Sequence, residues 1–164
     1  MKIFLLLFAY SVCTQFAFGQ NTNFTIKEID SIVKRIDSTC ISGDVTDYII
    51  HKKGHKKKTI GGGADWFFTD TSGAKLLKAV RETSIESENR DSYYFYNDSL
   101  IYLKISHGAH IEDKTKMNWQ GQYYFQNSKL IFKQDNLKVV FNPTRYLETA
   151  RQFFSPGQIW KESK

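Results

Sequence analysis

Two near-identical segments, 30 residues apart, constrain the fold of this 164-residue chain more than any other feature. Tyr93-Tyr94-Phe95 and Leu100-Ile101-Tyr102 recur without a gap as Tyr123-Tyr124-Phe125 and Leu130-Ile131-Phe132. Self-similarity of this kind defines a structural unit. Each copy places apolar runs on both sides of a short polar segment, which is the pattern of a β-hairpin. The sequence therefore predicts tandem hairpins, with a coincidence of strand-forming residues as the alternative.

The predicted hairpins turn at Asn97-Asp98 and Asn127-Ser128, because asparagine and aspartate tolerate the positive φ of tight turns. Strand side chains alternate between faces, so four pairs are expected on one face: Phe95–Leu100, Tyr93–Tyr102, Phe125–Leu130 and Tyr123–Phe132. The other face of the second copy is mixed and is expected to meet water; it carries Tyr124, Gln126, Lys129, Ile131 and Lys133.

Helices are predicted at both ends of the hairpin region. Residues 24–41 begin with a capping box, Thr25 and Glu28, and Gly43 is expected to end the helix. Its apolar stripe is Ile29, Ile32, Val33, Ile36 and Cys40. Asn142-Pro143 predicts the start of the second helix. The stripe of that helix is Tyr146, Leu147, Ala150, Phe153 and Phe154.

The fold class that follows is α+β, in a single domain over residues 24–160. An N-terminal helix and a C-terminal helix flank an antiparallel meander of repeated hairpins, with about six to eight strands. The polar stretches 86–91 and 107–117 are predicted to be connections, and 48–50 and 137–141 short strands.

The first 19 residues have the pattern of a secretory signal peptide. Lys2 precedes the apolar run Ile3–Ala9, and Ala17-Phe18-Gly19 suits cleavage before Gln20. The apolar run is too short for a spanning helix, and no later segment approaches that length. We therefore expect a secreted or periplasmic protein with no transmembrane segment after cleavage. Cys40 is then its one cysteine, so no internal disulfide is expected.

The densest charge lies in His51–Lys58, where five of eight residues are lysines. Mutual repulsion predicts a solvated hairpin tip or loop. Two roles stay open for Lys52, Lys53, Lys56, Lys57 and Lys58: a solubilising loop, or an anion site that holds the protein at the envelope surface through acidic lipid or an acidic partner. A nucleic-acid partner is not expected, because no arginine or aromatic residue interleaves the lysines.

Patterns for nucleotide or nucleophilic chemistry are missing from the sequence. Gly61-Gly62-Gly63 lacks the spacing of a phosphate loop, so these glycines are expected to allow a bend or a close backbone approach at a strand entrance. No Gly-x-Ser-x-Gly turn occurs, and Cys40 lies on an apolar stripe. No cofactor is expected. The single enzymatic alternative is a metal site or hydrolase built on His107, His110, Glu112 and Asp113, residue types that bind zinc or copper.

Tyr94, Tyr96, Trp119 and Tyr124 form a candidate exposed aromatic face, since aromatic side chains with a polar atom suit recognition surfaces. Plain packing against a terminal helix is the alternative. The leading functional hypothesis is an exported, non-enzymatic binding or interaction module for an unknown protein or envelope component.

A resemblance agrees with this hypothesis. Through Gly61-Gly62-Gly63, Trp66-Phe67-Phe68 and the two Tyr-Tyr-Phe segments, the chain resembles small, uncharacterised exported bacterial proteins with an N-terminal helix and repeated hairpins. More loosely, it resembles the PepSY and β-lactamase-inhibitor-like folds, whose members act mainly by binding or inhibiting. The resemblance implies a periplasm or cell exterior and supplies no active residues.

Overall fold

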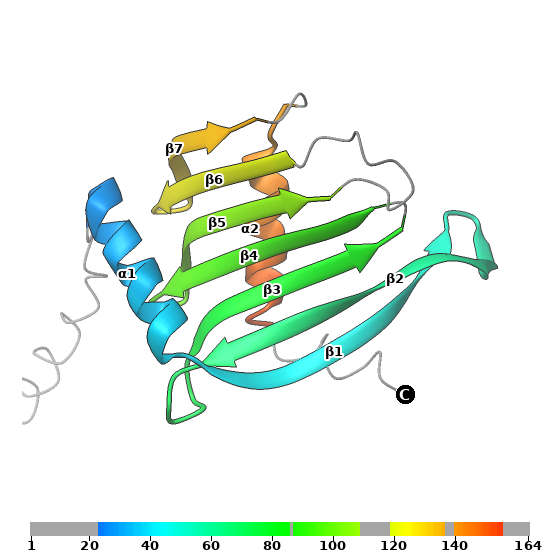
Figure 1. Ribbon diagram of the computed structural model, residues 1–164, viewed down its shortest axis with the longest axis horizontal. Coiled ribbons are helices and arrows are strands. Elements are labelled where there is room, and N and C mark those ends of the chain that lie inside the picture. Colours follow the sequence, from blue (N-terminus) through cyan, green and yellow to red (C-terminus); the bar gives the residue numbers. More distant parts are fainter. Residues whose placement is uncertain (1–22, 86, 109–118, 137–139, 156–164) are drawn as a thin grey trace, which may run out of the picture.

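The computed structural model describes residues 23–85, 87–108, 119–136 and 140–155, of which residues 55–57 by their backbone only. These residues form, in order, α1 (Ile26–Thr39), β1 (Ile41–Lys52), β2 (His55–Thr69), β3 (Leu76–Ser84), β4 (Glu88–Tyr96), β5 (Ser99–His107), β6 (Trp119–Gln126), β7 (Lys129–Asp135) and α2 (Pro143–Gln152). Each strand pairs antiparallel with the next, in one sheet (Figure 1). The predicted α+β class and its helix–meander–helix order are confirmed.

The two predicted turns have the geometry that the sequence indicates. Asn97 and Asp98 have φ of 47° and 57°, and Asn127 and Ser128 have 50° and 59°. Positive φ at both central residues is the signature of a type I′ turn, whose twist matches that of the flanking strands. The two-residue turn prediction is therefore confirmed for β4–β5 and for β6–β7.

The pairing next to each turn is confirmed, and the pairing beyond it is wrong. Phe95 faces Leu100, and Phe125 faces Leu130. A β-bulge then shifts the register by one residue, so the predicted partners Tyr93–Tyr102 and Tyr123–Phe132 do not meet. The bulge leaves Ile101 and Ile131 as the extra residues, and the observed pairs are Tyr93–Leu103, Tyr94–Tyr102, Tyr123–Lys133 and Tyr124–Phe132.

Helices cover both faces of the sheet, α1 one face and α2 the other (Figure 1). The α2 face carries the larger core: Phe67, Ala79, Tyr93, Phe95, Leu100, Leu103, Ile105, Tyr123 and Phe125, against Ala150 and Phe153. The α1 face carries Tyr94, Ile101, Tyr102 and Tyr124 under Ile29 and Ile36. The prediction that the second face of this hairpin meets water is therefore wrong for Tyr124, which is 5% exposed. It is right for Lys129 and Ile131, which are exposed. Lys133 is exposed as well, but after the bulge it pairs with Tyr123 on the α2 face, so its predicted face is wrong.

Helix α1 begins as predicted and ends earlier. The Thr25 hydroxyl accepts from the Glu28 amide at 3.3 Å, and Glu28 Oε2 accepts from the Thr25 amide at 2.7 Å, which completes the capping box. The helix ends at Thr39, and Cys40 leads directly into β1. Gly43 lies inside β1, where a Cβ atom would stand 3.1 Å from the Phe67 carbonyl oxygen. The predicted stop at Gly43 is therefore wrong.

Helix α2 begins as predicted, because the Asn142 side chain accepts from the Thr144 amide at 3.1 Å. Ala150 and Phe153 are buried, with Tyr146, Leu147 and Phe154 packed beside them. Val140 and Phe141 are not in a strand; the rest of the predicted strand 137–141 lies outside the described residues, as do the signal peptide and residues 156–160. Over the described residues, neither helix is long and apolar enough to cross a membrane.

Candidate functional site

The predicted aromatic face is not open. Tyr94 and Tyr124 are 4% and 5% exposed, both beneath α1. Tyr96 is half-buried and packs edge-on against Phe24, with ring centroids 5.2 Å apart. Trp119 is half-buried at the far end of β6. The expectation of one exposed surface made by these four residues is therefore wrong, because α1 covers its centre.

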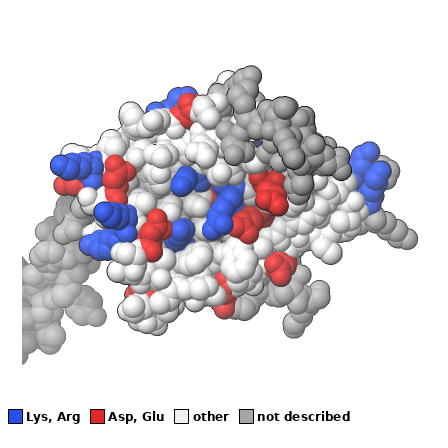
Figure 2. All heavy atoms as spheres, viewed as in Figure 1, with Lys and Arg blue, Asp and Glu red and all other residues white. Residues whose placement is uncertain are grey.

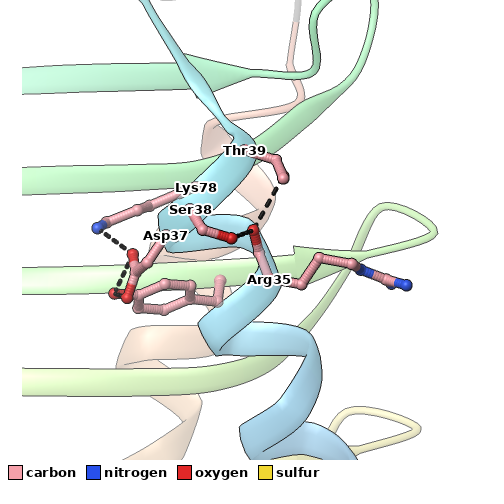
Figure 3. A network of polar contacts seen from close by, with 6 residues as sticks. Arg35, Asp37, Ser38, Thr39 and Lys78 are labelled. Carbon is pink, nitrogen blue, oxygen red and sulfur yellow. Dashed lines mark hydrogen bonds and ion pairs between the residues drawn. The ribbon is translucent and has the colours of Figure 1, made fainter.

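Tyr94 and Tyr124 hydrogen-bond to carboxylates of α1. The Tyr94 hydroxyl lies 3.1 and 3.2 Å from the two Asp37 carboxylate oxygens, and Lys78 Nζ lies 2.7 Å from Asp37 Oδ1 (Figure 3). The Tyr124 hydroxyl donates to Asp30 Oδ1 at 2.8 Å. Burial raises the pKa of both hydroxyls, and the neighbouring carboxylates raise it further. At neutral pH both tyrosines are therefore hydrogen-bond donors.

The spacing of these contacts explains how α1 crosses the sheet. Asp30 and Asp37 are seven residues apart, which corresponds to a rise of about 10.5 Å along a helix. Tyr94 and Tyr124 lie on strands with one strand between them, which corresponds to about 9.6 Å. Because the two spacings match, each tyrosine meets one aspartate. The second tyrosine of each Tyr-Tyr-Phe segment therefore docks a helix.

The predicted metal residues are described only at His107. Its Nε2 lies 3.2 Å from Asp91 Oδ1, and its ring stacks on Trp119. His110, Glu112 and Asp113 lie outside the described residues. Within the described part of the chain, no three histidine, cysteine or acidic side chains are placed to hold a metal ion. The metal or hydrolase alternative stays a prediction.

A second polar contact on the α2 face has a structural role. Arg81 Nε and Nη2 donate to the two carboxylate oxygens of Asp65 at 2.8 and 2.7 Å. Burial lowers the pKa of the Arg81 guanidinium, but the hydrogen bonds to Asp65 and the negative charge of that carboxylate, with smaller contributions from nearby tyrosines, together keep the pKa above its usual value. The guanidinium also lies 5.2 Å from the centre of the Phe153 ring, just past the end of α2. Arg81 and Asp65 therefore form an ion pair that supports the packing of α2.

The candidate site is a hollow of about 660 Å³ on the α1 face, beside that helix and over the strand ends that it leaves uncovered. Paired residues share a face, so two rows of side chains cross the strands there: Asp47, Ala64, Glu82, Arg90 and Ser106, and then Gly62, Ser84 and Glu88. Asn89, Thr83, Gly63 and Gly108 complete the lining. Figure 2 looks onto this face and shows acidic and basic atoms side by side on the sheet to the right of α1.

The charges around the hollow are unequal. Arg90 Nη1 lies 3.0 Å from Glu82 Oε1, and the Trp66 indole donates to Glu82 Oε2 at 3.2 Å. Asp47 and Glu88 form no ion pair with any other residue that the structure describes. The single arginine is already paired, and two carboxylates remain. The hollow therefore favours a ligand with a positive charge.

The glycine run supplies the floor of the hollow. A Cβ atom on Gly62 would meet one atom within 4 Å, the Tyr48 carbonyl oxygen at 3.4 Å, so Gly62 opens into free space. A Cβ atom on Gly63, on the opposite face, would stand 2.6 Å from the Tyr48 ring. At Gly61 it would stand 2.1 Å from the Ser84 carbonyl oxygen. The prediction of close backbone approach is confirmed at Gly61 and Gly63, but their predicted place at a strand entrance is wrong, because β2 begins at His55 and they lie inside it.

Sequence reasoning missed the charged residues of the hollow. It treated residues 86–91 as a polar connection, whereas β4 begins at Glu88 and continues to Tyr96. Glu82, Arg90 and Asp47 lie on three different strands, and only the register brings them together. The one available signal was the alternation Glu88-x-Arg90-x-Ser92, which continues into the first predicted hairpin.

The basic segment lies at the β1–β2 hairpin tip, as predicted. Gly54 turns the chain with φ of 80°, and Lys52, Lys53 and Lys58 are exposed. The side chains of Lys56 and Lys57 lie outside the described part. The role of these lysines as an anion site at the envelope surface stays a prediction.

Comparison with protein-family models, with curated proteins and with solved structures finds no match to this chain. The resemblance to exported hairpin proteins and to the PepSY and β-lactamase-inhibitor-like folds therefore stays a prediction.

Proposed function

We propose that this protein is an exported, non-enzymatic binding module whose ligand occupies the hollow on the α1 face. The observation that carries the proposal is the hollow itself: about 660 Å³, floored by Gly62 and edged by Asp47, Glu82, Glu88 and Arg90. Pockets for small molecules fall between about 300 and 1,000 Å³. The site is therefore of a size for one small ligand.

The lining selects the chemical class of the ligand. Carboxylates on β1 and β4 face a positive group, while the Ser84 and Ser106 hydroxyls suit hydroxyl or amide groups. The hollow is open and charged side chains edge it, so a lipid tail or a flat apolar ring gains little there. The proposed ligand is a small polar molecule with an ammonium group, of the amino-sugar class.

Export supports this assignment. The basic start at Lys2, the apolar run Ile3–Ala9 and the small residues before Gln20 form a secretory pattern. All described residues follow this segment in the chain. We place the protein in the periplasm or outside the cell, where amine-bearing envelope glycans and nutrients are available as ligands.

The two tyrosine hairpins belong to the same proposal. We infer that β4–β5 and β6–β7 are tandem copies of one unit, because turn, bulge and tyrosine–aspartate contact recur at the same positions. In this unit the aromatic residues build the scaffold and hold α1. Ligand recognition then falls to the polar strand ends that α1 leaves uncovered.

Two sugars of similar size that differ in charge test the proposed site by NMR. Glucosamine, with its amine protonated, is titrated into the isotope-labelled protein, and glucose, which lacks the amine, is the control. Shifts are expected for the amides of residues 47, 62–64, 82–84 and 88–90 with glucosamine and much weaker ones with glucose. Shifts spread over the surface, or equal responses to both sugars, would refute the site.

A further inference from the structure

The β1–β2 hairpin extends past the rest of the sheet. Strand β3 pairs with β2 only from Thr69 to Gly62, whereas β1 and β2 continue to pair as far as Lys52 and His55. Residues 50–61, here called the arm, therefore form a two-stranded ribbon that projects from the body (Figure 1). An isolated hairpin is at best marginally stable in water, so the arm contributes little to folding.

The arm carries nearly all of the net charge. Residues 50–61 contain five lysines and no acid, whereas the rest of the chain has 18 lysines and arginines against 17 acids, from totals of 23 and 17. Lys52, Lys53 and Lys58 are exposed, and none of them forms an ion pair with another described residue. Figure 2 shows lysine atoms at the far tip of the molecule, away from the acidic residues.

Apolar side chains surround the root of the arm. Ile49 is 66% exposed, Ile60 38% and Ile85 45%. Ile85 lies next to the arm, because a Cβ atom on Gly61 would stand 2.9 Å from the Ile85 Cα atom. Exposed apolar side chains next to lysines are the combination that binds a membrane interface: the apolar groups enter the headgroup boundary, and the lysines stay at the level of the phosphates.

We propose that the arm binds the surface of an anionic lipid bilayer. Charge complementarity selects an anionic partner, and the isoleucines favour a bilayer over a nucleic acid, which would use arginines and stacking aromatic rings instead. The body of the protein then lies beside the membrane. This inference does not depend on the ligand of the hollow.

Vesicle binding by matched charge variants tests the proposal. The arm variant is Lys52→Gln/Lys53→Gln/Lys58→Gln, and the control is Lys27→Gln/Lys34→Gln/Lys129→Gln, whose lysines are exposed on α1 and β7. Both variants lose the same net charge, and both keep the apolar segment Ile3–Ala9, so its contribution cancels. Co-sedimentation with vesicles of phosphatidylcholine alone, and of equal parts phosphatidylcholine and phosphatidylglycerol, measures the affinity.

One lysine near an anionic surface contributes about fivefold in affinity, so the arm variant is expected to bind anionic vesicles about a hundredfold more weakly. The control variant is expected to lose less than about fivefold, because its lysines are distant from the bilayer. Binding by the parent protein should need phosphatidylglycerol and should fall steeply at about 1 M salt, where the Debye length is about 3 Å. Equal losses in the two variants, or salt-insensitive binding to both kinds of vesicle, would overturn the proposal.

A second variant tests the apolar part. Ile49→Ser keeps all lysines and should weaken binding to anionic vesicles several-fold, with the larger relative loss at high salt. Unchanged binding would remove the isoleucines from the interface and leave a purely electrostatic contact.

Discussion

Gly62 and Gly63 are neighbours in β2, yet they act on opposite faces of the sheet. Gly63 lies beneath the Tyr48 ring, which takes the place of a side chain there, and Gly62 opens into the hollow. Glycine in a strand costs conformational entropy. At Gly63 the ring contact explains why glycine is present, and at Gly62 nothing within the fold does. The proposed ligand site on the α1 face would account for a glycine at this position.

Alanine substitutions separate these two roles. Gly63→Ala should lower the free energy of unfolding by about 1–3 kcal/mol, because the new methyl group collides with the Tyr48 ring. Gly62→Ala should leave it unchanged or raise it by up to about 1 kcal/mol, since the methyl group meets only an ordinary contact. Urea denaturation of both variants measures the difference. Equal destabilisation would show that the floor of the hollow is packed.

A turn residue with positive φ is conformationally strained, and this strain lowers the stability of the fold. Ser128 has φ of 59°, where glycine is unstrained and an L-residue is disfavoured by about 1 kcal/mol. Ser128→Gly should therefore raise the free energy of unfolding by about 0.5–1 kcal/mol by completing an Asn-Gly type I′ turn. Lys129→Gly, one residue further along and inside β7, is the control and should lower it by a similar amount. The reverse order of stability would contradict the turn assignment.

At the scale of elements, two tyrosine–aspartate contacts fix where α1 lies. Both combine a buried ring with a charged acceptor on the helix, and hydrogen bonds to charged groups contribute about 1.5–3 kcal/mol when shielded. Asp37 is 45% exposed, so water weakens the Tyr94 contact. The shorter contact of Tyr124 with Asp30, at 2.8 Å, is the better test.

A double-mutant cycle on Tyr124→Phe and Asp30→Asn should give a coupling free energy of about 1 kcal/mol. Tyr102→Phe is the matched control: its ring packs on the same face between Tyr94 and Tyr124. Its hydroxyl makes no hydrogen bond with any residue in the described ranges. Combined with Asp30→Asn, it should therefore show little coupling. A cycle with zero coupling at Tyr124 would remove the hydrogen bond as the docking contact.

At the scale of the whole molecule, packing on both faces of the sheet shifts many tyrosines together. Burial raises the pKa of Tyr102 and Tyr146 to about 12, and raises the pKa of Tyr93, Tyr94, Tyr123 and Tyr124 further. A tyrosine in the unfolded chain ionises near pH 10. Below pH 10 these tyrosines are neutral in both states, and the folded protein keeps its full free energy of unfolding. As the pH rises from there through the folded-state pKa values, ionisation favours the unfolded chain and that free energy falls.

The free energy of unfolding should therefore fall steadily above about pH 10. Urea denaturation at a series of alkaline pH values measures it, and ultraviolet absorbance at the phenolate band reports ionisation. Tyrosinate formation should coincide with unfolding. Ionisation of the six tyrosines near pH 10 in a protein that stays folded would contradict their burial.

The fold could be predicted from the sequence to the level of its elements. The apolar alternation around Asn97 and Asn127 and the capping box at Thr25 are local signals, and the structure agrees with each. The bulges at Ile101 and Ile131 could not be predicted, since a local pattern does not reveal an inserted residue. In β7 the extra residue moves every later side chain to the other face, so Lys133 pairs with Tyr123. Tyr124 was expected in water for another reason: no local pattern indicates that α1 covers its face.

The candidate site could not be predicted from the sequence for a related reason. Asp47, Glu82 and Arg90 belong to three strands, and their proximity depends on the register across the whole sheet. Moreover, the uncovered part of the α1 face depends on where α1 crosses the strands, which its contacts with two distant tyrosines help to fix. Neither the register of the whole sheet nor the position of α1 on it can be read from a local sequence pattern.

Filling the hollow tests the central claim most directly. Gly62→Phe places a phenyl group on the floor of the site, in a strand that favours aromatic residues, and Gly62→Ala is the control. Titration calorimetry with protonated glucosamine is expected to show binding to the parent protein and to Gly62→Ala, and none to a folded Gly62→Phe variant. Glucosamine binding that survives in Gly62→Phe would place the ligand elsewhere and contradict the proposed function.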